Sequence, residues 1–462
     1  MTNNIKEDLL LFNELVAVFL EDEFQNPVSE YIKPHEVKRM IDIKLGEEGI
    51  IDSEFKIVLK ELLRKSPKSS SKLFFNQLFG GRHSKAVLGD LLAVMLNNSM
   101  ATYKISGPQV AIEKEILSQV NKLIGYDKNA GGTFPTGGSM SNFMSLIMAR
   151  DKVNLNIKEA GMSQNLVAYT SDNAHYSLSK NASFSGLGRA NIRHIQSDEY
   201  GRINVLEFEK QVHIDLVNGF IPFYLNATAG TTVLCAFDNI SELEPICKKN
   251  NIWLHLDGAF GGSVIFSDKY KYLVDGIHLT NSFCFNAHKT LGAPLSTSIL
   301  VVKDKNDLYN SFNNNATYLY QTHDEDFNLG QTSFECGRRN NALKLWTMWK
   351  AIGIRGIANI VEQEFKLADI ARNYIDNNED YKRCNFGDSL SICFNYKDFD
   401  AEDICTKLYE TNTLMVGFGI FQNKRFIRLV IVNCENSIDD LMQFFKVLEE
   451  FAKTNQHAIK KI

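Results

Sequence analysis

The sequence lacks the patterns of several protein classes. Its eight cysteines include no Cys-x-x-Cys pair, and several lie in apolar runs, which argues against a zinc site and a disulfide framework. No window approaches the roughly 18 apolar residues that a membrane-spanning helix requires, and the acidic N-terminal segment shows no leader pattern. We therefore expect no metal, no membrane partner and a cytoplasmic location.

An excess of basic residues is also missing. The 50 lysines and arginines are outnumbered by 55 acidic residues, which gives a net charge of −5. A broad basic field that would attract nucleic acid is therefore not expected. Apolar material is plentiful instead: 44% of the 462 residues are hydrophobic and 11% are aromatic, enough for a large core and at least one further domain.

Residues 1–107 are predicted to form an N-terminal helical segment. Apolar residues recur there at three- and four-residue spacing, and residues 66–71 are typical of a loop. The spacing fits helices of an ordinary core as well as a clamp on a second subunit. The recurring residues are Leu9, Phe12, Val16 and Phe19, then Val87, Leu91, Val94 and Met95.

The pattern changes in residues 108–335 to short apolar runs that alternate with helical stretches. Such runs predict an α/β fold, with a mostly parallel sheet covered on both faces, and sheets of this kind bind ligands beyond the carboxyl ends of their strands. Residues 336–462 are predicted to form a small C-terminal α+β domain. The strand candidates are residues 166–170, 192–195, 222–227, 252–256, 282–287 and 298–302, then 391–394 and 426–432.

A glycine-rich segment, residues 136–142, precedes an apolar helical pattern. The backbone N–H groups of Gly137 and Gly138 and the hydroxyl of Ser139 would lie at the positive end of a helix, where a phosphate fits. Taken alone, such a segment is most often a capped turn. Its spacing matches neither the Walker pattern nor a dinucleotide fingerprint.

Two reactive side chains stand at the ends of predicted strands. Asp257 closes the run at 252–256, and Lys289 follows the run at 282–287, 32 positions later. Apolar surroundings would favour the neutral, nucleophilic amine of Lys289, and a buried carboxylate at 257 needs a cation. A pyridoxal 5′-phosphate enzyme needs both groups, an amine that bonds to the cofactor and a carboxylate that keeps its ring nitrogen protonated.

Each of these residues has a plainer interpretation by itself. Asp257 would also serve as a helix cap, and a lysine at a strand end is usually exposed. His175 follows a strand and is placed to lie flat on a cofactor ring, although a lone histidine is more often structural. The hypothesis depends on all of them together.

The order of the motifs is more specific than any one of them: the glycine-rich segment, His175, residues 226–232, Asp257, and His288 with Lys289. In this order the chain, from about residue 70 to 445, resembles the group II pyridoxal phosphate decarboxylases, within the glutamate, cysteine sulfinate and aspartate decarboxylase branch. The resemblance implies a fold-type I architecture. It also implies a homodimer whose active sites lie at the subunit interface and whose N-terminal helices wrap the partner.

The resemblance assigns roles to the candidate residues. Lys289 would bind the cofactor covalently, Asp257 would pair with the ring nitrogen, and His175 would stack on the ring. Tyr318 matches a mobile-loop tyrosine that supplies a proton after carbon dioxide leaves, and the long polar connection around it is typical of a lid; Tyr320, two positions on, could be mistaken for it. The remaining cofactor contacts would be Gly137, Gly138, Ser139, Thr228, Ala259 and His288.

The substrate residues implied by the resemblance are Phe75, Gln77, Phe79 and Arg428. Arg428 matches an arginine near the substrate carboxylate. Phe79 is more similar to the cysteine sulfinate and aspartate members, in which a larger side chain would shorten the pocket. The chain departs from the family at Ala287, where proline is frequent, and at Phe260, where a bulkier aromatic is frequent, but neither change removes a reactive group.

We therefore predict decarboxylation of an L-amino acid to the amine and carbon dioxide, with aspartate, cysteine sulfinate or glutamate as the favoured substrates. The alternatives are a decarboxylase of 2,4-diaminobutyrate or of an aromatic amino acid, an aldehyde synthase on the same scaffold, and a catalytically silent binding module. The presence of Tyr318 argues against the synthase, and intact Lys289, Asp257 and His175 argue against the silent module.

Overall fold

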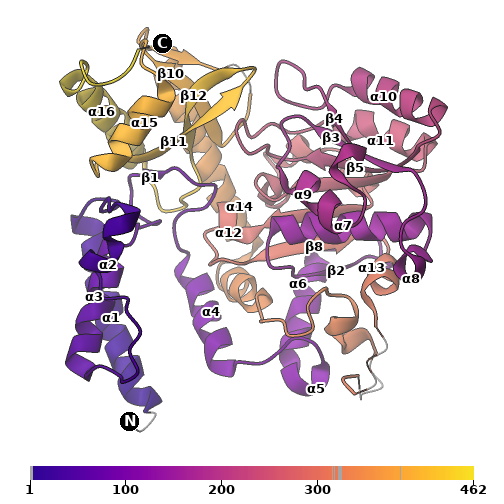
Figure 1. Ribbon diagram of the computed structural model, residues 1–462, viewed down its shortest axis with the longest axis horizontal. Helices are drawn as coiled ribbons and strands as arrows, with labels where there is room; N and C mark the ends of the chain where they lie inside the picture. The colour runs from indigo at the N-terminus through magenta and orange to yellow at the C-terminus, as the bar shows by residue number, and fades with distance from the viewer. Residues whose placement is uncertain (1–3, 315, 317, 321–324, 385–386, 462) are drawn as a thin grey trace. The chain divides into compact units, whose positions relative to one another are not determined.

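The computed structural model describes residues 4–314, 316, 318–320, 325–384 and 387–461. The chain forms two compact units (Figure 1). The first unit contains Met1–Gly81, Ile370–Cys384 and Cys393–Ile462, and the second contains Arg82–Asp369 and Asn385–Ile392. Residues 82–107 of the predicted N-terminal segment thus belong to the second unit, and the three-part division into domains stays a prediction.

A seven-stranded sheet forms the centre of the second unit. The strands β3 to β7 pair in parallel, whereas β8 pairs antiparallel with both β2 and β7. This topology confirms the predicted α/β class and its mostly parallel sheet. The order across the sheet is β2 (Gly131–Thr133), β8 (Ser298–Val302), β7 (Ser282–Asn286), β6 (Trp253–Gly258), β5 (Ile221–Thr228), β3 (Leu166–Ser171) and β4 (Ile192–Ile195).

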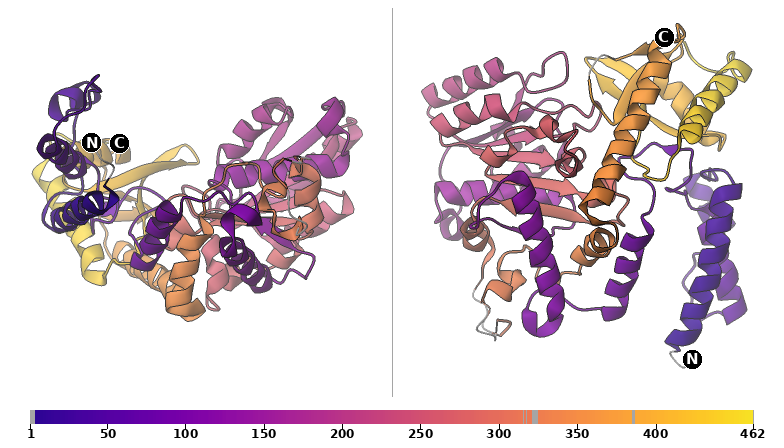
Figure 2. Two further views of the ribbon diagram at one scale, coloured as in Figure 1. Left: turned by 90° about the horizontal axis from the view of Figure 1, so that it is seen from below. Right: turned by 180° about the vertical axis from the view of Figure 1, so that it is seen from behind.

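Helices α7 (Gly138–Val153) and α10 (Val205–Val217) cover opposite faces of this sheet (Figures 1 and 2). On one face, Asn142 of α7 hydrogen-bonds to His255 of β6, and the His255 ring stacks on Tyr224 of β5. Tyr224 pairs in register with Ala168 of β3, so the next residue, Tyr169, points to the other face. Its ring contacts Phe208 of α10, with centroids 5.4 Å apart. Burial on both faces explains why these strands read as continuous apolar runs.

The first unit contains a five-stranded sheet in which β1 comes from the N-terminal region. β1 pairs in parallel with β11, and β11 pairs antiparallel with β12. Helices α15 (Ala401–Glu410) and α16 (Ile438–Thr454) complete the α+β arrangement predicted for the C-terminal region. The order across this sheet is β1 (Phe74–Phe75), β11 (Met415–Phe421), β12 (Lys424–Val430), β10 (Ser391–Tyr396) and β9 (Tyr381–Arg383).

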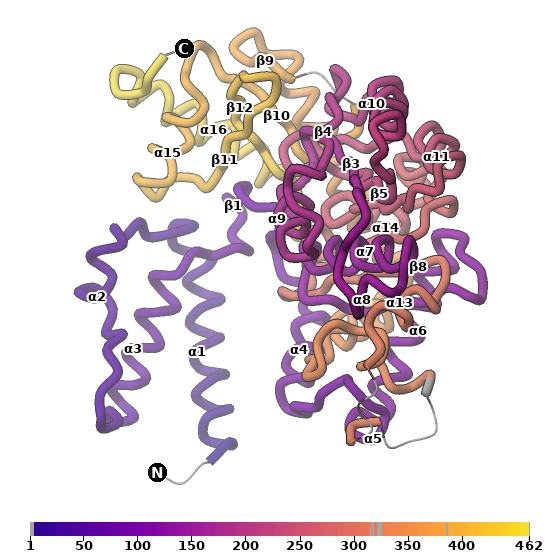
Figure 3. Tube along the Cα trace, turned by 45° about the vertical axis from the view of Figure 1, so that its right-hand side comes forward, coloured from indigo at the N-terminus to yellow at the C-terminus, as the bar shows by residue number. Residues whose placement is uncertain are grey.

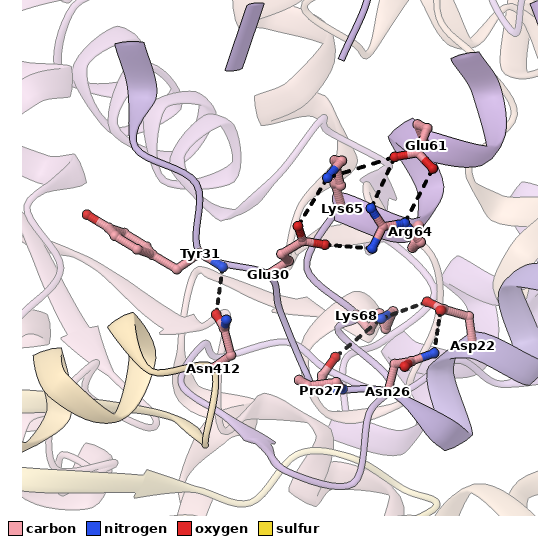
Figure 4. Close-up of polar contacts among 10 residues, drawn as sticks. All are labelled: Asp22, Asn26, Pro27, Glu30, Tyr31, Glu61, Arg64, Lys65, Lys68 and Asn412. Atoms are coloured by element: carbon pink, nitrogen blue, oxygen red, sulfur yellow. Dashed lines mark hydrogen bonds and ion pairs between the residues drawn. The ribbon is translucent and has the colours of Figure 1, made fainter. Parts of the chain in front are cut away.

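Charged side chains tie the N-terminal helices of the first unit together. Helices α1 (Ile5–Gln25) and α3 (Asp52–Lys65) lie side by side (Figure 3). Glu30, between them, accepts from Arg64 at 2.9 Å and from Lys65 at 3.0 Å (Figure 4). The buried Lys68 pairs with Asp22 at 2.7 Å. Because Lys68 and Lys65 are almost fully excluded from solvent, these pairs fix the connection between the helices more firmly than surface pairs would.

The other elements connect these two sheets and their helices. No helix among the described residues has both the length and the apolar character that crossing a membrane requires. The other α-helices are α2 (Val37–Met40), α4 (Ser84–Leu96), α5 (Tyr103–Ser106), α6 (Pro108–Ile124), α8 (Ile157–Ala160), α9 (Ser177–Phe184), α11 (Ile240–Lys249), α12 (Ala287–Thr290), α13 (Lys305–Phe312) and α14 (Ala342–Asp376), which bends at Gly353. The 3-10 helices are η1 (Pro34–Glu36), η2 (Arg189–Asn191), η3 (Gly262–Phe266), η4 (Lys271–Val274), η5 (Ile277–Leu279), η6 (Glu325–Phe327) and η7 (Leu329–Gln331).

Candidate active site

Four predicted residues lie at the carboxyl ends of adjacent parallel strands in the second unit. Thr228 is the last residue of β5, and it pairs in register with Asp257 of β6. Lys289 lies in α12, directly after β7, and His175 lies between β3 and α9. Because neighbouring parallel strands end at the same edge of a sheet, these side chains share one edge. The charges of Asp257 and Lys289 both act on the His175 ring, as expected for groups this close.

Asp257 is a buried carboxylate that accepts hydrogen bonds from the protein on both oxygens. Its side chain is 4% exposed. Oδ2 accepts a hydrogen bond from Asn142 Nδ2 at 2.6 Å, and Oδ1 accepts one from the backbone N–H of Ala259 at 3.0 Å. Hydrogen bonds donated to a carboxylate stabilise its charged form, so Asp257 can meet a cation without a further protein partner.

Lys289 is half-buried, and its neighbour His288 is buried and neutral. The backbone N–H of Thr297 donates to His288 Nδ1 at 2.9 Å. Burial lowers the pKa of His288 to about 4, and the charge of Lys289 acts in the same direction. The proton of the neutral ring therefore resides on Nε2, which is left as an N–H donor.

The ring of His175 is also held in one tautomer. The backbone N–H of Ser177 donates to His175 Nδ1 at 3.2 Å. Burial lowers the pKa of His175; the nearby carboxylate of Asp257 opposes this change and the charge of Lys289 reinforces it. A neutral, half-buried imidazole is suited to stacking on a flat ligand.

The two glycines at the start of α7 differ in their surroundings. A Cβ atom added to Gly138 would lie 2.9 Å from the Cβ of Ala259 and 3.2 Å from Asn286 Nδ2, whereas one added to Gly137 would meet nothing within 4 Å. Gly138 therefore allows the helix N-terminus to approach the ends of β6 and β7 closely. The next residue, Ser139, is exposed. Open space, backbone N–H groups and a hydroxyl at a helix N-terminus suit a phosphate group.

Two buried polar atoms at the same strand ends indicate that a polar ligand completes the site. Among the described residues, neither Thr228 Oγ1 nor Asn286 Oδ1 has a hydrogen-bond partner. Buried polar atoms in proteins are normally paired. Together with the amine of Lys289 and the carboxylate of Asp257, they fit a ligand that carries an aldehyde, a ring nitrogen and a phosphate, which is the chemistry of pyridoxal 5′-phosphate.

The remaining predicted residues lie apart from this group in the chain. Tyr318 is 78% exposed, in a segment whose residues 315, 317 and 321–324 lie outside the described part. The predicted substrate residues belong to the first unit. Phe75 is a buried residue of β1 whose ring packs on Phe444, with centroids 5.1 Å apart. Gln77 is exposed and Phe79 is half-buried. The roles of these residues stay predictions.

Arg428, the fourth predicted substrate residue, lies on β12 and is partly buried. Its Nη2 donates to the backbone carbonyl of Asn76 at 2.9 Å. Burial lowers the pKa of Arg428, but a guanidinium remains charged at any physiological pH. The structure thus holds a cation on this strand within the first unit.

Sequence reasoning overlooked Asn142 and His255. Asn142 lies one turn into α7 and contacts Asp257, and His255 lies two positions before Asp257 on the same strand. The period of two along a strand places His255 and Asp257 on one face. That spacing was the signal that would have identified His255.

Comparison with known proteins identifies the family of this chain. Residues 34–397 match the model of the pyridoxal-dependent decarboxylase conserved domain. The acidic amino acid decarboxylase of Bos taurus is 33% identical, with 92% of this chain and 86% of the relative covered. The human cysteine sulfinic acid decarboxylase is 34% identical, with 79% and 76% covered. The crystal structure of mouse CSAD superposes with a TM-score of 0.91 at 28% identity, over 97% of this chain and 99% of that chain. The chain therefore belongs to the pyridoxal-dependent decarboxylase family, as its motifs predicted, and is a pyridoxal 5′-phosphate-dependent amino-acid decarboxylase.

Proposed function

We propose that this decarboxylase acts on an acidic L-amino acid, and that Lys289, Asp257, His175 and Tyr318 carry the reaction. The observation that supports the residue roles is the grouping of Lys289 and Asp257 at the ends of the neighbouring strands β7 and β6. The substrate class is supported by the relatives, because proteins named for acidic amino acids and for cysteine sulfinic acid match most of the chain.

Pyridoxal 5′-phosphate supplies an electron-accepting ring that stabilises the negative charge formed at the substrate α-carbon. The amine of Lys289 would hold the cofactor through its aldehyde. Asp257, held by Asn142 and Ala259, keeps a proton on the ring nitrogen. His175 covers the ring and excludes water, and Gly137, Gly138 and Ser139 hold the phosphate at the N-terminus of α7.

Tyr318 is the proposed proton donor to the substrate α-carbon. Protonation at this carbon, rather than on the cofactor, yields an amine instead of an aldehyde. Tyr318 is exposed in the single chain, which suits a residue that completes a site shared between two subunits. Loops that carry such a residue commonly close over an active site after the substrate binds.

Arg428 is the proposed contact for a substrate carboxylate. Its guanidinium is partly desolvated and is held by the Asn76 carbonyl, so an anionic group would gain a strong, charge-assisted hydrogen bond there. Phe75, Gln77 and Phe79 are the other proposed substrate residues. The relatives' preference for acidic amino acids fits a site with a fixed cation.

A homodimer is the proposed assembly. Helix α4 exposes a set of large apolar side chains that soluble monomers rarely leave in water; a second copy of the chain would cover them. The cytoplasm is the proposed compartment, because several of the eight cysteines lie in apolar runs, as reduced core cysteines do. The exposed residues on α4 are Leu88, Leu91, Leu92, Val94, Met95 and Leu96.

A substrate panel tests the proposal. The purified holoenzyme is incubated with aspartate, glutamate, cysteine sulfinate, 2,4-diaminobutyrate and aromatic amino acids, and carbon dioxide and amine are measured. We expect kcat/KM for one of the acidic amino acids to exceed that for 2,4-diaminobutyrate and the aromatic amino acids by at least about 100-fold. The reason is that the other substrates would leave the guanidinium of Arg428 without an anionic partner. A Lys289→Ala variant should release no carbon dioxide. A preference for 2,4-diaminobutyrate or an aromatic amino acid would refute the substrate assignment.

A further inference from the structure

A line of buried hydrogen bonds runs beneath Asp257, from the interior of the second unit to its carboxylate. Asn142 Nδ2 donates to Asp257 Oδ2 at 2.6 Å, and Asn142 Oδ1 lies 3.1 Å from His255 Nε2. On the far side of the ring, His255 Nδ1 lies 2.8 Å from Ser282 Oγ. Asn142 is 1% exposed and both His255 and Ser282 are 0% exposed, so water does not compete for these bonds.

The groups at the two ends fix the direction of every bond in this line. A carboxylate only accepts, so the Asn142 amide must donate to Asp257 and present its oxygen to His255. His255 then carries its proton on Nε2 and accepts at Nδ1 from the Ser282 hydroxyl. Ser282 Oγ in turn accepts from the indole N–H of Trp253 at 2.9 Å, and from the hydroxyl of Ser145 at 2.8 Å. Asn142 Nδ2 also donates to Ser177 Oγ at 3.0 Å, so both donors of this amide are used.

The protonation state of His255 agrees with this direction. Burial lowers the pKa of His255 to about 4, although the nearby carboxylate of Asp257 opposes the change. The ring is therefore neutral at physiological pH and has one donor and one acceptor, as the line requires. Hydrogen bonds that point the same way polarise one another, so each donor increases the partial positive charge that Asn142 presents to Asp257.

We propose that Asn142 and His255 are positioning residues that orient the Asp257 carboxylate, and thereby keep the cofactor ring nitrogen protonated. Neither residue is assigned contact with the cofactor or the substrate. The inference rests on the proposed role of Asp257, and it adds the residues that hold this carboxylate in position. Without the Asn142 donor, Asp257 Oδ2 would lose its 2.6 Å hydrogen bond, while Oδ1 would keep those from the Ala259 N–H and the Cys284 thiol.

Other titratable groups surround Asp257. Cys284 Sγ lies 3.8 Å from Asp257 Oδ1, and burial raises the pKa of its thiol well above the usual value. The Cys284 thiol therefore stays uncharged at physiological pH. The remaining groups whose charges interact with Asp257 or its neighbours are His175, Tyr224, His255 and Lys289.

The test uses holoenzyme reconstituted with pyridoxal 5′-phosphate labelled with ¹⁵N in the ring, whose chemical shift reports the proton on that nitrogen. In the wild-type protein we expect a protonated nitrogen at pH 7.5. In Asn142→Leu and in His255→Leu the midpoint of its titration should fall by about one pH unit, and the dissociation constant of the cofactor should rise about tenfold. His255→Gln keeps an N–H donor and an acceptor, so it should restore part of the loss.

A matched control separates positioning from general loosening. Thr170→Val removes another buried hydrogen bond of the same sheet, from Thr170 Oγ1 to the Asn226 carbonyl at 3.0 Å, that does not involve Asp257. The control should leave the nitrogen titration unchanged. If Asn142→Leu and His255→Leu titrate like the wild type, or if Thr170→Val shifts the midpoint as much as they do, the inference is wrong. An unprotonated nitrogen in the wild type would instead refute the proposed role of Asp257 itself.

Discussion

Glu113 and Arg338 form a buried, doubly hydrogen-bonded ion pair. Arg338 Nη1 donates to Glu113 Oε2 and Nη2 donates to Oε1, both at 2.8 Å. The two side chains are 0% and 2% exposed. Glu113 lies on α6, and Arg338 lies in the segment between η7 and α14. The pair fixes to α6 the segment that follows the Tyr318 region in the chain.

Removing one partner of this pair should destabilise the second unit strongly. In Glu113→Ala, the Arg338 guanidinium would remain buried without its counter-charge, at a cost of about 3–5 kcal/mol. Urea unfolding of the apoprotein measures this change. Lys210→Ala removes an exposed pair with Glu207, 3.2 Å long, and should leave the unfolding free energy nearly unchanged. Equal effects of the two substitutions would contradict the prediction.

The buried histidine at 255 should make the fold sensitive to acid. Its pKa is about 4 in the folded protein and 6.5 in an unfolded chain, so stability is fully present above pH 6.5 and is lost as the pH falls toward 4, because only the unfolded state takes up the proton. Between pH 7 and pH 5 this residue should account for about 2 kcal/mol of lost stability. Urea unfolding of the apoprotein at several pH values should show a flatter profile in His255→Gln. A profile parallel to that of the wild type would count against a neutral, buried His255.

Exchange of Tyr318 for phenylalanine should change the products of the reaction. If Tyr318 donates the proton to the α-carbon, Tyr318→Phe should slow amine formation by about 100-fold and raise the proportion of aldehyde. Tyr320→Phe is the matched control, because Tyr320 lies two positions away and has no proposed role in the reaction. Burial raises the pKa of Tyr320, and its substitution should leave the products unchanged. Chromatography of the products under oxygen measures both. A wild-type product ratio and rate in Tyr318→Phe would show that another group is the acid.

Adjacent glycines at the start of α7 should respond differently to alanine. In Gly138→Ala the new methyl group would lie 2.9 Å from the Ala259 Cβ, and overpacking of this kind costs about 1–3 kcal/mol. Gly137→Ala meets open space and should leave the stability of the apoprotein unchanged. Thermal unfolding measures the stability of each apoprotein, and fluorescence titration with pyridoxal 5′-phosphate measures whether each variant still binds the cofactor. The prediction fails if Gly137→Ala lowers the stability of the apoprotein more than Gly138→Ala does.

The residues at strand ends could be predicted from the sequence because two local signals coincide there. A buried parallel strand reads as an apolar run, and the polar residue that ends it is conspicuous. Asp257 near the end of β6 and Lys289 after β7 were found in this way. Strands without such a run were missed. β2 contains only Gly131–Thr133, and β11 is interrupted by Gly417 and Gly419, so neither has the pattern of a strand.

The polar groups behind the site could not be predicted in the same way. Asn142 reaches Asp257 across 115 positions of the chain, and Ser282 meets Ser145 across 137. No local pattern specifies which helix face covers which strand. Tyr318 is the opposite case. A sequence motif identifies this residue, but its side chain is exposed in the structure of one chain.

The first unit is assembled from both ends of the chain, because β1 at residues 74–75 pairs with β11 at 415–421. Ribosomes synthesise proteins from the N-terminus, so residues 1–81 emerge long before the strand that completes their sheet. The second unit, which begins at residue 82, is almost entirely translated in the interval. The nascent N-terminal segment must therefore keep side chains such as Phe75, which is buried against Phe444 in the folded unit, in water until then. Chaperones would be needed in this interval to prevent aggregation.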